Sequence, residues 1–355
     1  MATLEAGRTS ADIVGFIRSG ILTGKHQVGK YVPPTRELGD KYGVSPETVR
    51  RALKILEREE LIESVPRHGF RVVGAGGMLS ASCPVAYVTY FEDDLSNAHP
   101  VNRALSPALQ AAAGRRGWTV LGAHSADKDL SRLGEQLLAA RVWGIVLDTL
   151  DPAVLEQLSA TGLPVVMTNS WFEDVDVDAV LQDNYRGGFQ AAAHLAAAGA
   201  GRIGWLGPVG QFRASRERFA GAVAALAAAG LAIEPDAVID TRAEDGPERL
   251  KRALSEENRP DGFCVFWKDA AGRLKAAADE LGLAIGTDLR VVGWAVEEFY
   301  DLEHQSTWGT KHVPPAVVWR AADMAEAALD RLEARRRGLE GSPIRISVPT
   351  AIRRA

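Results

Sequence analysis

A short predicted helix near the N-terminus carries a row of basic side chains. Apolar residues recur at helical spacing through 46–58 and predict a helix with a core face: Val49, Ala52, Leu53 and Leu56. The basic residues of this segment lie largely off that face: Arg50, Arg51, Lys54 and Arg58. Such side chains neutralise phosphates, and arginine also makes paired hydrogen bonds to guanine. The exposed face therefore has the chemistry to meet nucleic acid.

The residues before this helix predict two further helices. The first helix has an apolar stripe formed by Ile13, Phe16, Ile17 and Ile21. Pro33-Pro34-Thr35 then interrupts the chain, and we expect Thr35 to be the N-cap of a short helix over 36–42 that ends at Gly43.

The third helix should begin with Ser45 as its N-cap, followed by Pro46 in the first turn. Two short β-like stretches follow it, 61–65 and 70–73, around Arg67-His68-Gly69. Three helices and a hairpin give residues 1–76 the layout of a small winged helix-turn-helix domain. This part holds 12 basic and 9 acidic residues, a balance of +3, whereas the rest of the chain has a balance of −8.

Residues 28–73 resemble the winged helix-turn-helix of the GntR family. The resemblance is carried by three stretches and the turn His68-Gly69: Val28–Leu38, Tyr42–Leu53 and Leu61-Ile62. It implies that the third helix enters the major groove and that the His68-Gly69 turn lies at the minor groove. The DNA-binding residues it implies are Arg36, Ser45, Thr48, Arg50, Arg51, Lys54, His68 and Gly69.

Within this set, Thr48 and Arg50 are expected near base edges, and Arg36 near a phosphate or a base edge. We expect Arg51, Lys54, Arg67 and Arg71 to contact phosphates, although Lys54 and Arg58 have the alternative of merely solvating the helix. Pro46 stands where the family usually has arginine. One contact is therefore lost or shifted, and the family does not supply the operator sequence.

From Pro84 onward the chain alternates between candidate strands and alanine-rich helices. The candidate strands are Val85–Phe91, Thr119–Gly122, Gly144–Leu147, Val165–Thr168, Arg202–Leu206, Ala237–Asp240, Gly262–Trp267 and Arg290–Trp294. Helical segments such as Arg186–Ala198, Ser215–Ala229 and Ala270–Leu281 separate them. This alternation predicts an α/β fold with parallel sheets, and its length predicts two lobes rather than one.

Residues 84–355 resemble the sensor domain of the LacI family, which shares its fold with periplasmic sugar-binding proteins. The resemblance rests on five stretches and on His194-Leu195: Leu181–Gly188, Arg202–Gly207, Ser215–Gly221, Pro260–Phe263 and Asp288–Trp294. A GntR-type head on such a body is similar to arabinose-repressor-like hybrids. The expected division is a head over 1–76, a linker over 77–83 and a body of two lobes. Lobe 1 would hold 84–199 and 302–330, and lobe 2 would hold 200–301 and 331–355.

The family resemblance implies a cleft between the lobes, at the carboxyl ends of the strands, that binds a small sugar or sugar derivative. Asp183 matches an acceptor for sugar hydroxyls, and Arg216 matches an arginine that clamps the ligand. Asp269 matches another acceptor, with the alternative of a plain N-cap. Trp267 and Trp294 end two candidate strands and offer flat faces to a sugar ring; weaker candidates are Trp143, Trp171 and Trp308.

Two departures from the family concern the chemistry of the effector. Lys268 stands where the family often has asparagine, and Ala295-Val296 stand where it often has two aspartates. Polar anchors have gone and a cation has appeared. With Lys268 and Arg216 both expected at the cleft, an acidic sugar is a hypothesis that weaker binding of uronates than of neutral pentoses would contradict.

The sequence offers little support for catalysis. We find no nucleophile elbow, zinc-protease motif or P-loop, and we expect no catalytic residues, metal or cofactor. Ser125 and Lys128 have a Ser-x-x-Lys spacing, which recurs by chance. The two cysteines, Cys83 and Cys264, are too far apart in sequence to suggest a zinc or redox motif, and reduced thiols in the cytoplasm are expected.

We see no signal peptide and no apolar run that could span a membrane, so we expect a cytoplasmic protein. The predicted function is a transcriptional regulator, a repressor of carbohydrate-utilisation genes. It would bind double-stranded operator DNA as a homodimer and respond to a sugar effector. A sugar-responsive activator is the alternative, followed by a sugar-binding module without a role on DNA.

Overall fold

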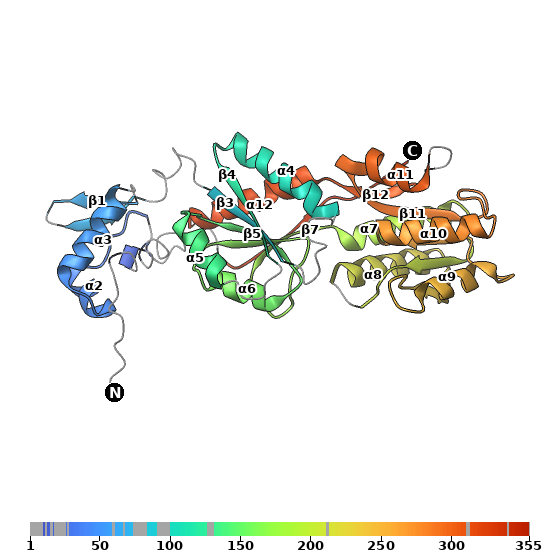
Figure 1. Cartoon of the computed structure of the whole chain (residues 1–355), viewed down its shortest axis with the longest axis horizontal. Coiled ribbons are helices and arrows are strands. Elements are labelled where there is room, and N and C mark those ends of the chain that lie inside the picture. Colours follow the sequence, from blue (N-terminus) through green and yellow to red (C-terminus); the bar gives the residue numbers. More distant parts are fainter. Residues whose placement is uncertain are drawn as a thin grey trace, which may run out of the picture.

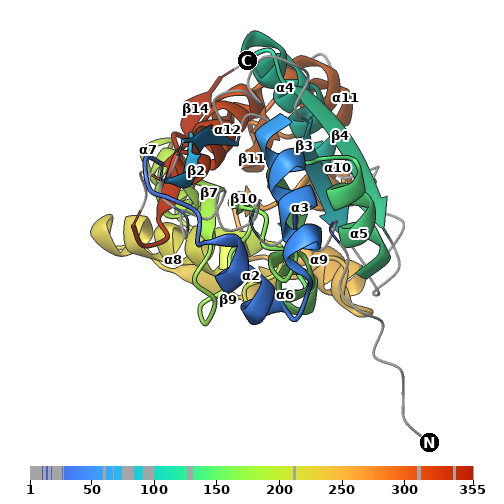
Figure 2. The ribbon, with the colours of Figure 1, turned by 90° about the vertical axis from the view of Figure 1, so that its left-hand side faces the viewer.

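The N-terminal part of the chain folds as a small helical head with a β-hairpin (Figures 1 and 2). A computed structural model describes Ser10, Ile13, Val14, Ile17, His26 and residues 28–58, 61–66, 68–73, 84–90, 100–125, 131–210, 213–309, 313–338 and 341–354. The head contains α2 (Thr35–Tyr42), α3 (Pro46–Arg58) and an antiparallel hairpin of β1 (Ile62–Val65) and β2 (Gly69–Val72).

Burial in the head follows the helical spacing of the sequence. The predicted core residues Val49, Ala52, Leu53 and Leu56 of α3 are all buried. Ile13 and Ile17 of the first helical stripe join them in one apolar cluster, whereas Phe16 and Ile21 lie outside the described residues. Burying one face of α3 leaves the opposite face of that helix in solvent.

The helix ends agree with the sequence at two of three positions. Gly43 ends α2 with φ 68°, a conformation that glycine adopts without strain. Ser45 precedes α3, and its Oγ accepts a hydrogen bond from the Thr48 amide at 3.2 Å, as an N-cap does. The expected N-cap role of Thr35 is wrong, because α2 already begins at Thr35 and Pro34 is the cap residue without a side-chain bond.

Lobe 1 is a parallel six-stranded sheet covered on both faces. Its strand order is β13-β7-β6-β5-β3-β4, with β3 (Pro84–Tyr90), β4 (Thr119–Ser125), β5 (Ile145–Thr149), β6 (Val165–Thr168), β7 (Asp178–Gln182) and β13 (Arg345–Val348). One face packs against α4 (Pro100–Arg115) and α12 (Ala321–Arg336), and the other against α5 (Ser131–Ala139) and α6 (Pro152–Ser159) (Figure 1).

Lobe 2 repeats this arrangement, with one antiparallel strand at its edge. Its order is β14-β12-β11-β10-β8-β9, with β8 (Ile203–Leu206), β9 (Ile233–Ile239), β10 (Gly262–Val265), β11 (Arg290–Val296), β12 (Ala316–Trp319) and β14 (Ala351–Arg353). Helices α7 (Asn184–Ala197) and α8 (Arg213–Ala228) cover one face, and α9 (Gly246–Ser255) and α10 (Lys268–Glu280) the other (Figure 1). The predicted α/β fold with parallel sheets is thus confirmed.

The chain passes between the lobes three times, after β7, after β12 and after β13. The expected lobe boundaries therefore need correction. Residues 184–199 and 302–319 belong with lobe 2, and residues 331–348 belong with lobe 1. In the sequence, each of these three connections looks like an ordinary strand end, because local residue patterns do not indicate on which lobe the next element packs. The expected linker over 77–83 lies outside the described residues.

Candidate functional sites

The exposed face of α3 carries the basic side chains that the sequence singled out. Arg50, Arg51 and Lys54 are exposed, as is Arg36 in the first turn of α2. Thr48 is half-buried, and its hydroxyl lies 2.9 Å from that of Ser45. Arg50 makes an exposed ion pair with Glu47 at 3.3 Å, a contact weak enough in water to yield to a phosphate or a base. The face of α3 that is predicted to contact DNA is therefore accessible to solvent.

The wing holds its turn at the predicted place. Gly69 has φ 94°, and the exposed His68 ring stacks on Tyr31 with their centroids 6.0 Å apart. Residues 29–32 pair with β2, as the Val32 amide donates to the Phe70 carbonyl at 2.8 Å. Arg71 is already engaged by Glu63, with its Nε 2.8 Å from a carboxylate oxygen. Arg67 lies outside the described residues.

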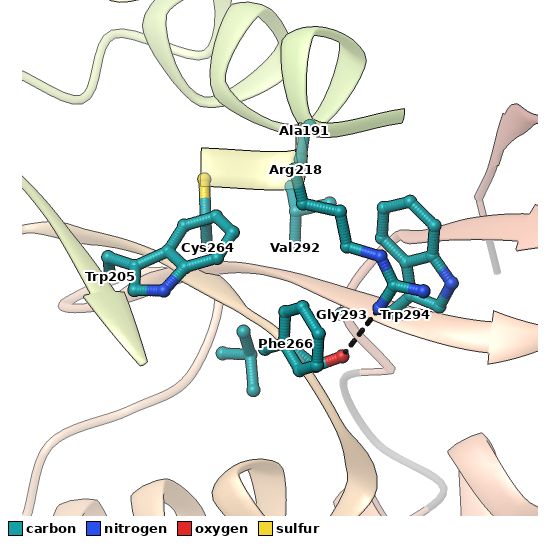
Figure 3. Close-up of a pocket in the computed structure, with 10 residues that line it drawn as sticks. Ala191, Trp205, Arg218, Cys264, Phe266, Val292, Gly293 and Trp294 are labelled. Carbon is teal, nitrogen blue, oxygen red and sulfur yellow. Dashed lines mark hydrogen bonds between the residues drawn. The ribbon is translucent and has the colours of Figure 1, made fainter. Parts of the chain in front are cut away.

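A buried polar network joins the two lobes where β7 ends. Arg218 of α8 is only 6% exposed, and its guanidinium lies 3.6 Å from the centroid of the Trp294 ring. It donates to Gln182 Oε1 at 2.7 Å and to Asn184 Oδ1 at 2.9 Å. A weaker bond of 3.4 Å reaches the Phe266 carbonyl oxygen, which Figure 3 marks.

Gln182 is the centre of this network. It is the last residue of β7 in lobe 1, and its Oε1 also accepts a bond from Trp294 Nε1 at 2.9 Å. Its Nε2 donates to Asn169 Oδ1 at 2.9 Å, on the lobe 1 side. Burial lowers the pKa of Arg218 well below its usual value, and the nearby charge of Glu217 opposes that shift only in part.

The structure separates two arginines that stand two residues apart. Arg216, the predicted clamp, is exposed and reaches Glu173 of lobe 1 at 3.5 Å. Arg218, which sequence reasoning missed, points into the protein between the lobes. The signal was available, since Gly221, Ala222 and Ala225 continue its helix face at the spacing of buried residues. A ligand role for Arg216 remains a prediction.

The predicted acidic residues take different positions. Asp183 is the N-cap of α7, and its carboxylate accepts from the Arg186 amide at 3.1 Å. Asp269 lies exposed in the first turn of α10, one residue after Lys268 begins that helix. The cap residue is Trp267, so the alternative of Asp269 as a plain N-cap is wrong. A ligand role for either acid remains a prediction.

The tryptophans divide between the edge of lobe 2 and the core. Trp267 and Trp294 are half-buried, the first two residues after β10 and the second inside β11, two residues before its end, and Arg242 lies 4.6 Å from the Trp267 ring. Trp171 is packed between Arg213 of lobe 2 and Arg345. The other two weaker candidates, Trp143 and Trp308, are buried in apolar clusters.

The cavity beneath Arg218 and Trp294 is small. Its volume is about 10 Å³, close to what one water molecule requires. Its wall comprises Gly188, Ala191, Trp205, Arg218, Cys264, Val265, Phe266, Val292, Gly293 and Trp294 (Figure 3). A sugar does not fit inside it.

A second buried titratable group lies on the lobe 1 side of the network. Asp148 is fully buried at the end of β5, and burial raises the pKa of its carboxyl to about 8. The nearby Asn169 amide offsets part of that shift. Neither carboxyl oxygen has a well-formed hydrogen bond to a described residue. Asp148 was not singled out from the sequence as a buried acid.

The described residues contain no group of three or more side chains placed to hold a metal ion. Cys264 is buried and its thiol pKa is raised to about 12 by burial. Cys83 and Lys128 lie outside the described residues, as does the side chain of Ser125. No helix in the described part of the chain is both long and apolar enough to cross a bilayer.

The two folded parts define a winged helix-turn-helix head joined to a two-lobed binding domain. Residues 9–72 match the family model described as bacterial regulatory proteins, gntR family. Residues 192–355 match the periplasmic binding protein-like domain. The chain thus combines a gntR-family helix-turn-helix domain with a type I periplasmic-binding-protein-like domain.

Curated relatives are regulators by name. The arabinose metabolism transcriptional repressor of Geobacillus stearothermophilus is 24% identical over 302 residues, which cover 78% of this chain and 79% of the relative. The ribose operon repressor of Haemophilus influenzae is 28% identical over 38% of this chain and 41% of its own length. The chain spans about two-fifths of the length of the first curated relatives it matches.

Solved structures share the fold. A complex of the transcriptional regulator CelR with cellobiose superposes with a TM-score of 0.66 at 21% identity, over 98% of both chains. A LacI family regulator from Enterococcus faecium with bound ribose gives a TM-score of 0.60 at 18% identity, over 76% of this chain and 97% of the other.

Proposed function

We propose that this chain is a DNA-binding transcriptional regulator whose affinity for an operator is controlled by a small sugar or sugar derivative bound between the two lobes. The observation that carries the proposal is the pairing of two features in one chain. An exposed basic face on α3 lies in a gntR-family head, and a buried arginine network joins the lobes of a sugar-receptor fold. A repressor of carbohydrate-utilisation genes is the form that the named relatives favour.

In the proposed mechanism the ligand changes the balance between two arrangements of the lobes. A ligand shifts such an equilibrium only by its preference for one arrangement. Contacts between the lobes, such as the ion pair of Arg216 with Glu173, stabilise the closed arrangement in that equilibrium. In a cytoplasmic homodimer, the change in lobe arrangement would alter the spacing of the two heads. Their fit to a near-palindromic operator would change with that spacing.

The test is fluorescence anisotropy of the full-length protein on DNA tiles taken from the region upstream of its own gene. We expect tight binding to one tile that one pool of pentoses, hexoses or uronates abolishes. Replacing Arg50 by alanine should weaken binding by about 5- to 150-fold, the range for loss of a base contact. The matched control is Arg252→Ala, which removes an exposed arginine from α9 in lobe 2.

If no tile binds in low salt, with or without sugars, the proposed regulator is refuted. Binding that a sugar strengthens instead would leave the regulator in place and contradict release by ligand. A gene expressed more strongly in the presence of the unliganded protein would favour the activator, which is the second candidate.

A further inference from the structure

We propose that the effector is an anionic sugar derivative whose carboxylate or phosphate is held on lobe 2 by Arg218 and Lys268. This inference rests on the proposed function, since it concerns the same cleft between the lobes. It specifies the chemical class of ligand that the cleft selects. Three observations on the carboxyl ends of the lobe 2 strands support it.

The first observation is a buried cation that makes no direct ion pair with a described residue and has only the nearby charge of Glu217 to offset its burial. Arg218 is 6% exposed, and its hydrogen-bond partners are the oxygens of Gln182, Asn184 and Phe266, which are all neutral. Burying an unpaired charge is costly, and proteins normally pair such a charge or leave it for a ligand. The nearest acid in sequence, Glu217, is held by Arg213 at 2.9 Å and by Asn184 at 3.2 Å. An anion bound between the lobes would supply the missing charge.

The second observation is that further cations stand at the same edge. Lys268 is exposed at the first position of α10, directly after β10, and no carboxylate in the described part of the chain pairs with it. Arg242 follows β9 and lies over the Trp267 ring. The acids close by are Asp240, which accepts from the Arg242 amide, and the exposed Asp269. They leave the Lys268 ammonium without a carboxylate partner among the described residues, whereas an anion would have to compete with neutral oxygens for the Arg218 guanidinium.

The third observation is that this edge already attracts a carboxylate. Glu173 of lobe 1 reaches across to Arg213 and Arg216 of α8. At the end of β11, by contrast, Ala295 and Val296 offer no side-chain acceptor for the hydroxyls of a neutral sugar. The edge of lobe 2 therefore presents hydrogen-bond donors and positive charge, with arginines stacked on the rings of Trp267 and Trp294.

Isothermal titration calorimetry on the full-length protein tests the inference with matched sugars. The probes are glucose, glucuronate and glucose 6-phosphate, then galactose, galacturonate and galactose 6-phosphate. We expect an anionic member of one set to bind at least about 10-fold more tightly than its neutral parent, because a charged hydrogen bond contributes roughly that much. The carboxylate and phosphate arms decide which anion the site prefers.

Lys268→Asn should reduce this preference by about 10-fold and bring the anionic and neutral members closer together. The matched control is Lys275→Asn on the same helix, where the lysine pairs with Asp279 at 2.5 Å. The control should leave the preference unchanged, and both variants should unfold at similar temperatures.

Three results would overturn the inference: a neutral parent that binds as tightly as its anions, an unchanged preference in Lys268→Asn, or no binding of any anionic member at millimolar concentration. Operator release by a neutral sugar would refute the anionic effector while leaving the regulator intact. Loss of all operator binding in the anisotropy assay would refute the regulator itself, so the two failures are distinguishable.

Discussion

Replacing Asp148 by asparagine should make the stability of the protein less dependent on pH. The carboxyl is fully buried, and burial raises its pKa from 3.8 to about 8. The folded state therefore retains a proton that the unfolded state releases. Stability from this group is complete below pH 3.8 and is lost as the pH rises through 8. Tyr87 supports this environment, because its pKa is raised by burial and then by the charge that Asp148 would carry.

The magnitude follows from linkage. Between the unfolded and folded pKa values, each pH unit costs about 1.4 kcal/mol of folding free energy for one such group. From pH 5 to pH 7 the wild-type protein should lose about 3 kcal/mol through Asp148 alone. The Asp148→Asn variant lacks this titration and keeps nearly the same shape. Its advantage in unfolding free energy over the wild type should therefore grow by about 3 kcal/mol across that range.

Urea denaturation at several pH values between 5 and 7, followed by circular dichroism, measures this difference. The matched control is Asp174→Asn, which removes an exposed acid from the same lobe and should follow the wild-type profile. Parallel profiles for Asp148→Asn and the wild type would show that Asp148 is ionised in the folded protein, and the reasoning would fail.

Two further predictions concern residues of α7 and α8 in lobe 2. Arg218→Met should weaken binding of the sugar found by calorimetry at least about 10-fold. The free energy of unfolding in urea should change by no more than about 2 kcal/mol, because removing a costly buried charge offsets the lost hydrogen bonds. Unchanged sugar affinity would contradict a ligand-binding role for Arg218. Gly188→Ala places a Cβ 1.9 Å from the Arg218 carbonyl oxygen, so thermal unfolding should report a loss of about 1–3 kcal/mol or more. Gly272→Ala on α10 meets nothing within 4 Å and should instead stabilise the helix slightly.

The elements of the head and the strand–helix alternation of the body were predictable because they follow local rules. Ser45 caps α3, and the apolar spacing of α3 is the spacing of its buried face. Strand β6 has the predicted bounds, 165–168. Strands β7, β12, β13 and β14 were not predicted, since a strand of three to five residues is recognised mainly from the sheet that it completes.

The candidate ligand site was only partly predictable from the sequence. The predicted strand ends at Trp267 and Trp294 are each off by two residues, because β10 ends at Val265 and β11 continues to Val296. The choice of Arg218 over Arg216 could have been made from the helical spacing of Gly221, Ala222 and Ala225. The burial of Asp148 required knowing that β5 extends past Leu147, which depends on packing between segments that are distant in the sequence.

The position of Arg218 would couple the binding of an anionic ligand to the arrangement of the two lobes. Its guanidinium belongs to lobe 2, yet its shortest hydrogen bond is to Gln182, the last residue of β7 in lobe 1. The chain passes into lobe 2 directly after Gln182, so a change in the arrangement of the lobes would also change the position of Gln182 relative to Arg218. A ligand anion that draws Arg218 toward itself would compete with Gln182 for the same donors. Trp294 Nε1 also donates to Gln182, and it would keep that oxygen paired as the arginine turns. The free energy of holding the anion would therefore depend on the arrangement of the lobes, which is the condition for a ligand to shift that arrangement.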